Sequence, residues 1–181
     1  MEGDGTAALP ARSQAMLGRM KRVVIVGRGA SGKSTLAAQL GEITGLRIIE
    51  LDKIFWGPGL VATPHAQWIE VQERLATEDE WIMDGDLGPY DAVETRLRGA
   101  DTIILLDFSL LRCSWRAMRR SRERWDFWRW LLRYRRQSRP YLLAAIAEHA
   151  PKAILHVLRN PRAVRRFIAD SDRVHGVGLA E

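Results

Sequence analysis

The chain has 181 residues, of which 46% are hydrophobic, and this length suits one domain with a hydrophobic core better than two. No stretch reaches the roughly 18 uninterrupted apolar residues that a membrane helix needs, and the mixed charges of residues 1–20 are unlike a secretory signal. The single cysteine, Cys113, excludes an intrachain disulfide and a four-cysteine zinc site, and we expect a cytoplasmic protein.

The net charge of +6 is unevenly distributed along the chain. Residues 112–139 hold eleven arginines against two acidic residues, whereas residues 50–110 hold thirteen acidic residues against four basic ones. A basic segment of this kind needs an anionic partner, an acidic neighbour or much solvent around it. A triphosphate, a nucleic acid and the acidic half of the same chain all qualify.

The first half of the chain begins with a tail and continues with alternating strands and helices. Residues 1–20 are rich in glycine and alanine, and we expect a flexible tail there, before a single domain at 21–181. The run at 23–26 is apolar without polar alternation, which is typical of a parallel strand buried on both faces. After a glycine-rich loop, the pattern predicts a helix at 34–44, a strand at 47–51 and a helix at 63–77.

The second half of the chain repeats this alternation. Strands are expected at 81–83, 102–106 and 153–158. Helices are expected at 109–124, 127–137, 140–149 and 161–169. Strands that alternate with helices predict a parallel sheet in a three-layer α/β fold, and the right-handed crossover rule places helices on both faces of the sheet.

The loop after the first strand carries the pattern Gly-x-x-x-x-Gly-Lys-Ser at residues 27–34, between a predicted strand and a predicted helix. Its glycines, Gly27, Gly29 and Gly32, permit positive φ and a close approach of the backbone to phosphates. Successive N–H groups at a helix N-terminus then bind the anion. The alternative, a tight turn made by the glycines alone, is weakened because strand, loop, Lys-Ser pair and helix all agree.

Each position of the loop has an expected role toward a nucleoside triphosphate. Lys33 supplies a mobile positive charge for the outer phosphates, and the hydroxyl of Ser34, rather than that of Thr35, is in register to ligate Mg²⁺. The residues expected to contact the nucleotide are Gly27, Gly29, Ala30, Ser31, Gly32, Lys33, Ser34 and Thr35. The motif does not distinguish a kinase from an ATPase or a GTPase.

Absent motifs and acidic strand ends narrow the class of protein. The chain has one asparagine, Asn160, so it lacks the Asn-Lys-x-Asp motif that reads guanine, and it has no His-Arg-Asp of protein kinases. Three predicted strands end in acids, namely Asp52, Asp84 and Asp107. The carboxyl ends of parallel strands face the ligand, where a carboxylate can hold Mg²⁺, position a hydroxyl or accept its proton. These observations favour a small-molecule kinase.

A spaced set of further motifs accompanies the loop. They are Leu51-Asp52-Lys53-Ile54-Phe55-Trp56, Trp81-Ile82-Met83-Asp84-Gly85, Arg96-Leu97-Arg98-Gly99-Ala100-Asp101, Leu106-Asp107 and Arg159-Asn160-Pro161-Arg162. Through these residues the chain resembles, over roughly residues 21–170, the adenylate-kinase-like P-loop kinases known as topology modulation proteins. The loop alone is shared by many families, whereas the spaced set is much more particular.

This resemblance implies a nucleoside-monophosphate-kinase-like core with the strand order 2-3-1-4-5 and ATP as the phosphate donor. It implies that Asp84 organises Mg²⁺ through water, that Arg116 stacks on adenine and that Arg120 reaches phosphate, the two arginines being spaced as at the start of an adenylate kinase lid. The family often has Asp-Gly-Asn-Tyr where this chain has Asp84-Gly85-Asp86-Leu87. An acceptor contact through that Asn or Tyr is therefore expected to be lost or altered.

Several residues keep two interpretations at this point. In small kinases of this architecture the position of Asp52 faces the acceptor, where it would orient or deprotonate a hydroxyl, but the residue could equally cap a helix or turn. Asp107 could cap a helix that begins near Leu110. The tryptophans that either line an acceptor pocket or, more commonly, pack in the core are Trp56, Trp68 and Trp81.

The basic segment shows helical spacing. Arg112, Arg116 and Arg120 share one face of the helix predicted at 109–124. Its apolar counterpart is formed by Leu111, Trp115 and Met118, and the next helix repeats an apolar stripe at Phe127, Trp130, Leu131 and Tyr134. We favour a mobile lid near 112–139 whose arginines close over phosphates and exclude water. The alternatives are a solvated basic face over an aromatic core, and nucleic-acid binding, which the core spacing of the aromatics weakens.

The sequence thus predicts an ATP- and Mg²⁺-dependent kinase that acts on a small acceptor, either a nucleotide or a metabolite. The residues expected to act in catalysis are Lys33, Asp52, Asp84, Arg116 and Arg120. The metal is expected at Ser34 and Asp84, and Arg116 adds a further nucleotide contact. The alternative hypothesis is a nucleotide-dependent regulatory protein that binds nucleic acid through its arginine-rich segment.

Overall fold

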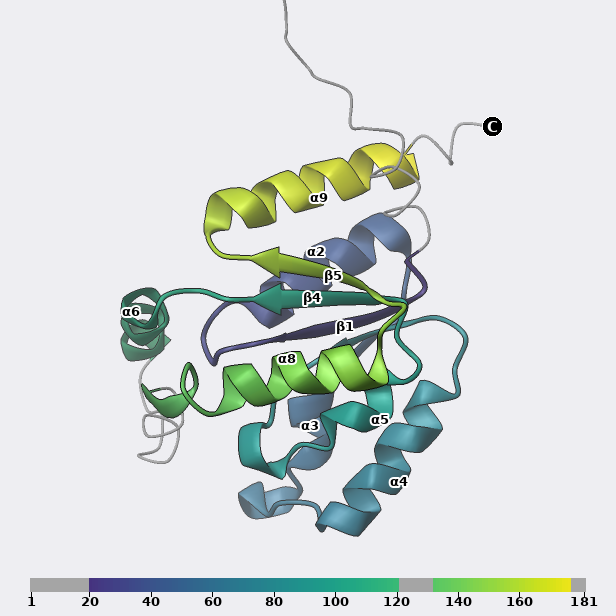
Figure 1. Cartoon of the computed structure of the whole chain (residues 1–181), viewed down its shortest axis with the longest axis vertical. Coiled ribbons are helices and arrows are strands. Elements are labelled where there is room, and N and C mark those ends of the chain that lie inside the picture. Colours follow the sequence, from purple (N-terminus) through teal and green to yellow (C-terminus); the bar gives the residue numbers. More distant parts are fainter. Residues whose placement is uncertain (1–19, 121–131, 177–181) are drawn as a thin grey trace, which may run out of the picture.

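A parallel sheet of five strands forms the centre of the computed structural model, which describes residues 20–120 and 132–176. The strands are β1 (Arg22–Gly27), β2 (Ile48–Glu50), β3 (Trp81–Asp84), β4 (Thr102–Leu106) and β5 (Ile154–Leu158). They are paired in the order β2-β3-β1-β4-β5, and every pairing is parallel. Figure 1 shows the arrowheads of β4 and β5 pointing to the same side. The predicted α/β fold and strand order are confirmed.

Helices cover both faces of this sheet, as the crossover rule predicts. One face is covered by α2 (Lys33–Thr44) and α9 (Pro161–Gly176). The other is covered by α3 (Leu51–Phe55), α4 (His65–Ala76), α5 (Val93–Leu97) and α8 (Ser138–His149). Figure 1 shows α9 and α2 on one side of the strands and α8, α5 and α4 on the other. The three layers position the carboxyl ends of the strands at one open edge.

Alternating residues of the central strand enter the two cores. In β1, Val23 and Ile25 pack with α2 and α9, whereas Val24 and Val26 pack with the helices of the opposite face. All four side chains are fully buried, which explains the continuous apolar run of this strand. Each such burial stabilises the fold by roughly 1.5–3 kcal/mol, so packing on both faces holds β1, from which the glycine-rich loop leaves, firmly in the sheet.

Two short helices were not predicted. Strand β2 ends at Glu50, and the chain turns at once into α3, so Asp52 lies on a helix rather than after a strand. The helix α5 occupies Val93–Leu97, which were left unassigned. Each has five residues, too few for a helical period to stand out against the apolar residues that both bury. The last helix also extends to Gly176 rather than ending near residue 169.

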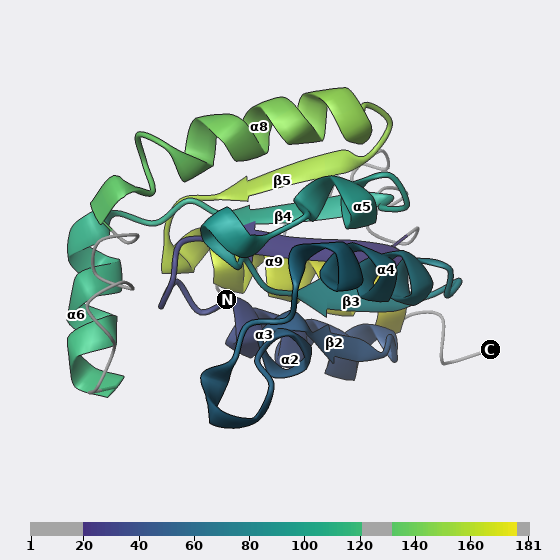
Figure 2. The same cartoon turned by 90° about the horizontal axis from the view of Figure 1, so that it is seen from below.

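The helix α6 (Leu110–Arg120) lies beyond the carboxyl ends of the strands, clear of the sheet in both views (Figures 1 and 2). Its buried residues are Cys113 and Ala117, whereas its apolar stripe of Leu111, Trp115 and Met118 is exposed, Leu111 to 84%. The alternative interpretation, in which this stripe packs in an aromatic core under a basic face, is therefore wrong for this helix. Small residues face inward here because they let α6 approach the loop that follows β1.

The remaining expectations concern the ends of the described ranges. Residues 121–124 and 127–131 of two predicted helices lie outside the described residues, as do residues 1–19 of the predicted tail. The tail prediction is wrong for Met20, which is buried in the core beside α2 and α9. The chain turns at 134–137, and α8 begins at Ser138 instead of near Pro140.

Within the described residues, none of the helices combines the length and the apolar character that crossing a membrane requires.

Candidate active site

The glycine-rich loop leaves β1 at the carboxyl edge of the sheet. Gly27 has a φ of 139°, and a β-carbon there would lie 2.6 Å from the carbonyl oxygen of Leu106 on the neighbouring strand. Gly32 has a φ of 101°. Gly29, for which the sequence permits a positive φ, does not adopt one, and among the described residues of the loop the third left-handed position is Ala30, with a φ of 59°. A non-glycine residue held there stores strain of about 1–3 kcal/mol, which is typical of ligand-binding turns.

The first turn of α2 presents free backbone N–H groups at the end of this loop. Its N-cap residue is Gly32, which has no side chain that could cap the first turn. The amides of the first turn and the positive end of the helix dipole are therefore available to an anion. Lys33 folds its ammonium back across the loop and donates a hydrogen bond to the carbonyl oxygen of Gly27 at 3.0 Å. Ser34 and Thr35 are exposed beside it.

One predicted lid arginine lies against the loop. The guanidinium of Arg116 donates from Nη1 to the carbonyl oxygen of Ser31 at 3.4 Å, and its atoms lie 3.1–3.5 Å from the point where a β-carbon of Gly32 would be. Arg112 instead lies over the ring of Phe108, 5.9 Å from its centroid. Arg120 is the last residue of α6, and its side chain lies outside the part of the chain that the structure describes.

The carboxyl group of Asp84 lies at the end of β3, directly beside β1, where Asp84 is in register with Ile25. It is 4% exposed, and its Oδ1 atom has no hydrogen-bond partner among the described residues. Burial raises the pKa of Asp84, while the charge of Lys33 and a hydrogen bond from Ser34 act in the opposite direction. The predicted phosphate and metal residues, Lys33, Ser34 and Asp84, are therefore brought together.

Asp52 joins this cluster from α3. Burial raises the pKa of the Asp52 carboxyl, Lys33 lowers it, and Asp84 raises it further, so all three groups lie within electrostatic range of one another. Part of the side chain remains exposed to solvent. The side chain of Asp52 does not occupy the N-cap position of α3, which is Glu50, and only its carbonyl oxygen takes part in capping, by accepting from the N–H of Trp56 at 3.4 Å. Its exposed carboxylate is placed to meet a ligand.

Asp86 is a further carboxylate of the site, and its role was not predicted. Its Oδ1 atom accepts a hydrogen bond from the N–H of Gly88 at 3.1 Å, and burial raises its pKa while Lys33 opposes the rise. The hydroxyl of Tyr134 forms a side-chain hydrogen bond with Asp86. A signal was present in the sequence, because Asp86 is where the chain departs from the Asp-Gly-Asn-Tyr of the family it resembles.

A buried ion pair holds the loop that carries these acids. Arg96 is fully buried and donates to both carboxylate oxygens of Asp91, at 2.7 and 2.8 Å. It also donates to Oε1 of Gln72 at 2.8 Å and to the carbonyl oxygen of Gly85 at 3.0 Å. Asp91 in turn accepts from the N–H of Leu87. The sequence showed no pattern for this network, because its members lie on two helices and a turn that no periodicity connects.

A second unpredicted contact joins the loop to residues on either side of α6. Arg28, within the phosphate loop, is buried and donates to the carbonyl oxygen of Phe108 at 3.4 Å. Its guanidinium lies 5.3 Å from the centre of the Tyr134 ring, a cation–π distance.

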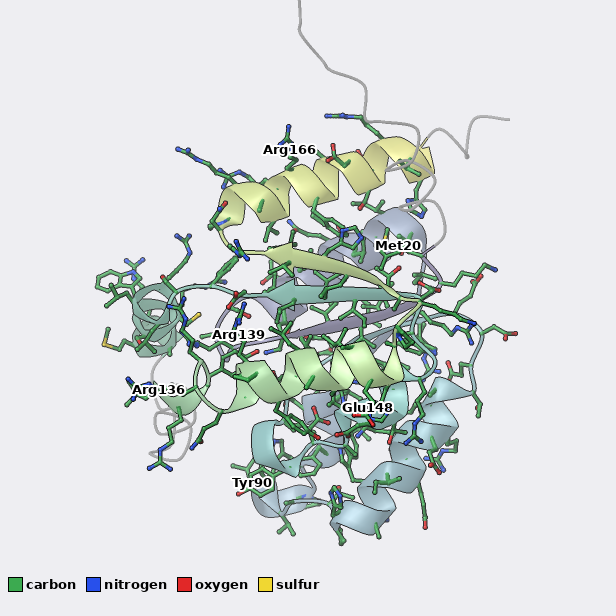
Figure 3. All side chains as sticks on the ribbon, in the orientation of Figure 1. Met20, Tyr90, Arg136, Arg139, Glu148 and Arg166 are labelled. Carbon is green, nitrogen blue, oxygen red and sulfur yellow. The ribbon has the colours of Figure 1, made fainter. Side chains whose placement is uncertain are left out.

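Asp107, which the sequence treated as a helix cap, pairs with Nε of Arg139 at 3.1 Å. Figure 3 places Arg139 at the start of α8, facing the ends of the strands.

The tryptophans divide between the two roles considered for them. Trp68 and Trp81 are fully buried and pack in the core, as expected for most tryptophans. Trp56 is partly exposed and lies edge-on to Phe55 and Tyr90, with ring centroids 4.8 and 6.1 Å away. Of these three tryptophans, Trp56 alone therefore remains available to a ligand.

The chain matches no known protein-family model and no curated protein. Solved structures with a similar fold include the shikimate kinase of Acinetobacter baumannii, with a TM-score of 0.61 and 13% identity over 93% of this chain and 99% of that one. A sugar kinase of Janibacter sp. HTCC2649 has a TM-score of 0.50 and 19% identity over 86% and 98% of the two chains. A gluconokinase of Sinorhizobium meliloti 1021 has the same score and identity over 88% and 95%. The fold is thus that of P-loop kinases.

Proposed function

We propose that the protein is a kinase that transfers the γ-phosphoryl group of ATP to a small acceptor, with Mg²⁺ as its cofactor. The observation that carries the proposal is the meeting of three features at the open edge of the sheet. These are the N-terminus of α2 and an oxygen of Asp84, neither of which has a side-chain partner in the part of the chain that the structure describes, and the ammonium of Lys33. The fold shared with a sugar kinase, a gluconokinase and a shikimate kinase supports it.

The loop residues hold the phosphates of the nucleotide. The N–H groups from Gly29 to Thr35 surround the phosphate chain, and Lys33 exchanges its hydrogen bond to Gly27 for the outer phosphate oxygens. Arg116, already against the loop, covers the nucleotide from the α6 side, and Arg120 follows it on the same helix face. Together with the chain up to residue 139, they form the lid that excludes water from the reaction.

The donor set beside Lys33 fits Mg²⁺. Ser34 offers an exposed hydroxyl, and Asp84 offers a buried carboxylate oxygen that lacks a partner among the described residues. Hard oxygen donors of this kind, completed by phosphate oxygens and water, suit a Mg²⁺ ion that keeps part of its hydration shell. The ion would neutralise charge on the phosphates during transfer.

Asp52 is the residue placed to act on the acceptor. In the transfer, an acceptor oxygen forms a bond to the γ-phosphorus, and the bond from that phosphorus to the bridging oxygen of ADP breaks. A hydroxyl acceptor loses its proton to the carboxylate of Asp52. The raised pKa that burial gives Asp52 makes it a better proton acceptor than an ordinary exposed aspartate. Most of the acceleration comes from positioning and charge neutralisation.

In this proposal the chain is a cytoplasmic member of the adenylate-kinase-like kinases known as topology modulation proteins. The sequence resemblance over roughly residues 21–170 supports the membership, and the single buried cysteine suits the compartment. The carboxyl edge of the sheet then serves as one active site within a single domain.

Turnover with an acceptor tests the proposal. We expect at least one compound among nucleotides, nucleosides and small metabolites to raise ADP release from Mg·ATP about 100-fold above the rate without acceptor. Asp52→Asn should lower kcat for that acceptor about 10²–10⁴-fold, because it removes the base. Asp79→Asn, an exposed acid on the turn before β3, should leave the rate unchanged. If no acceptor accelerates ADP release, the protein is not a kinase.

A further inference from the structure

Arg28 lies buried within the phosphate loop, 3% exposed, and none of the described carboxylates forms a salt bridge with it. The acids that follow the neighbouring strands β4 and β3 have other partners. Asp107 pairs with Arg139 at 3.1 Å, and Asp86 accepts from the N–H of Gly88 at 3.1 Å. Because taking an ion out of water without a counter-ion opposes folding, a buried arginine of this kind indicates an anionic ligand.

The guanidinium of Arg28 has most of its hydrogen-bonding capacity unused. Among the described residues it makes one hydrogen bond, a long one of 3.4 Å from Nη1 to the carbonyl oxygen of Phe108. Its Nε atom is buried and has no hydrogen-bond partner in the same residues. The ring of Tyr134, 5.3 Å from the guanidinium carbon, offers a cation–π attraction, which is weaker than charge-assisted hydrogen bonds to an oxyanion. The planar fork of donors is therefore available to phosphoryl oxygens.

The position of Arg28 brings it beside the other cation of the loop. Arg28 directly follows Gly27, whose carbonyl oxygen accepts from the ammonium of Lys33 at 3.0 Å, so both cationic residues adjoin one peptide group. The carbonyl oxygen of Arg28 accepts from the N–H of Ser31 at 3.2 Å, which closes the turn of the loop. The hydroxyl of Ser31 is also buried without a hydrogen-bond partner among the described residues. Both ends of this turn thus carry buried polar atoms that the oxygens of a ligand would satisfy.

We propose that Arg28 is an anion-binding side chain of the active site, a second cation beside Lys33 that takes phosphoryl oxygens. This inference rests on the proposed kinase function. On binding, the guanidinium exchanges its long contact with Phe108 for these oxygens, as Lys33 exchanges its bond to Gly27. Arg28 keeps its charge throughout, and this charge favours the phosphoryl group while negative charge spreads over its oxygens. The oxygens belong either to the terminal phosphoryl group of ATP or to a phosphate on the acceptor.

Calorimetric titration of the full chain with Mg·ATP and with Mg·ADP tests the first source. Arg28→Met removes the charge at similar length, and Arg28→Lys keeps the charge without the planar fork. Arg22→Met is the matched control, because Arg22 is exposed at the opposite end of β1. For the terminal phosphoryl group, Arg28→Met should lower ATP affinity about 10- to 100-fold and ADP affinity less than threefold. Arg28→Lys should recover part of the loss, and Arg22→Met should bind both nucleotides as the unaltered chain does.

A second titration tests the acceptor as the source. The chain is loaded with Mg²⁺ and a non-hydrolysable ATP analogue and is then titrated with inorganic phosphate. If Arg28 holds a phosphate of the acceptor, Arg28→Met should bind ATP and ADP normally and bind inorganic phosphate at least tenfold more weakly. Unchanged affinity of Arg28→Met for ATP, ADP and inorganic phosphate would overturn the inference.

Stability separates anion binding from a purely structural role of Arg28. A buried arginine without a counter-ion opposes folding, so Arg28→Met should leave the urea midpoint of the ligand-free chain unchanged or raise it. If the contacts with Phe108 and Tyr134 serve the fold alone, the midpoint falls, while the ratio of ATP to ADP affinity and the binding of inorganic phosphate stay unchanged. That combination would also overturn the inference.

Failure of this inference is distinguishable from failure of the kinase function. If the unaltered chain binds ATP and Arg28→Met changes none of the affinities, only the role of Arg28 is wrong. If the unaltered chain does not bind ATP, the kinase function fails, and the role of Arg28 fails with it.

Discussion

The backbone at Gly27 imposes two requirements that only a glycine side chain can meet. Its φ of 139° lies in the region that favours glycine, and a β-carbon would lie 2.6 Å from the carbonyl oxygen of Leu106. We expect Gly27→Ala to lower the free energy of unfolding by about 2–4 kcal/mol, because strain and overlap add. It should also weaken ATP binding, since β1 and β4 must separate at the loop. Urea denaturation and nucleotide titration measure the two effects.

Gly45→Ala is the matched control for this substitution. Gly45 also has a positive φ, of 74°, but a β-carbon there meets no atom within 4 Å. Its replacement should lower stability by only about 1 kcal/mol and leave ATP affinity unchanged. Equal losses of stability in the two variants would show that overlap with Leu106 contributes nothing to the destabilisation by Gly27→Ala.

The site acids oppose folding at neutral pH. Burial raises the pKa of Asp84, so the folded chain holds this proton to a higher pH than the unfolded chain, in which the value is about 3.9. Ionisation therefore lowers stability as the pH rises through the folded pKa. We expect Asp84→Asn to increase the free energy of unfolding at pH 7, although it abolishes turnover. The gain should shrink toward zero as the pH falls to about 4.

Urea denaturation between pH 4 and pH 8 measures this dependence. Asp172→Asn, at an exposed position on α9, should change stability equally at every pH. A loss of stability at pH 7 for Asp84→Asn would mean that the attraction of Lys33 outweighs burial. Such a result would reverse the sign of the argument.

At the scale of elements, α6 is linked to the phosphate loop through one arginine. Arg116 touches the loop at Ser31 and Gly32, whereas Arg112, one turn earlier, lies over the ring of Phe108. We expect Arg116→Ala to weaken ATP binding about 10- to 100-fold, because a charge-assisted contact to the nucleotide is lost. Arg112→Ala should weaken it less than threefold. Calorimetric titration distinguishes them, and equal effects would indicate general basic charge rather than contact.

Long elements were predictable, whereas the short ones that shape the site were not. The strands of continuous apolar residues and the helices α2 and α4 have patterns that repeat over several turns or fill a buried face. The helices α3 and α5 have five residues each, and tertiary packing rather than periodicity determines them. Since α3 carries Asp52 and α5 carries Arg96, the acceptor side could not be built from sequence alone.

Most side-chain contacts of the site could not be predicted from the sequence either. The strand ends predicted the convergence of Lys33, Ser34 and Asp84, because parallel strands share one carboxyl edge. The pairing of Arg96 with Asp91, and the contact of Arg28 with Tyr134, join segments far apart in the chain or lacking any common period. The sequence also could not show that Ala30, rather than Gly29, has the positive φ. Glycine permits that conformation without requiring it.

At the scale of the whole molecule, the uneven charge of the chain has a structural counterpart. The acidic residues Asp52 and Asp84 lie on α3 and β3, whereas the basic helix α6 contacts the phosphate loop through Arg116. A triphosphate is favoured next to the arginine. The order β2-β3-β1-β4-β5 produces this division, because it places β3 and α3 on one side of the loop and β4, which leads to α6, on the other.

The most direct test of the account is isothermal titration of the full chain with ATP and Mg²⁺, beside Lys33→Ala and Lys21→Ala. Lys21 lies at the opposite end of β1 and forms an exposed pair with Glu80, so its loss should leave ATP affinity unchanged. We expect ATP to bind the unaltered chain, with affinity lowered at least 100-fold in Lys33→Ala alone. Absence of ATP binding, or equal binding by the unaltered chain and Lys33→Ala, would contradict the assignment of this edge of the sheet as a kinase active site.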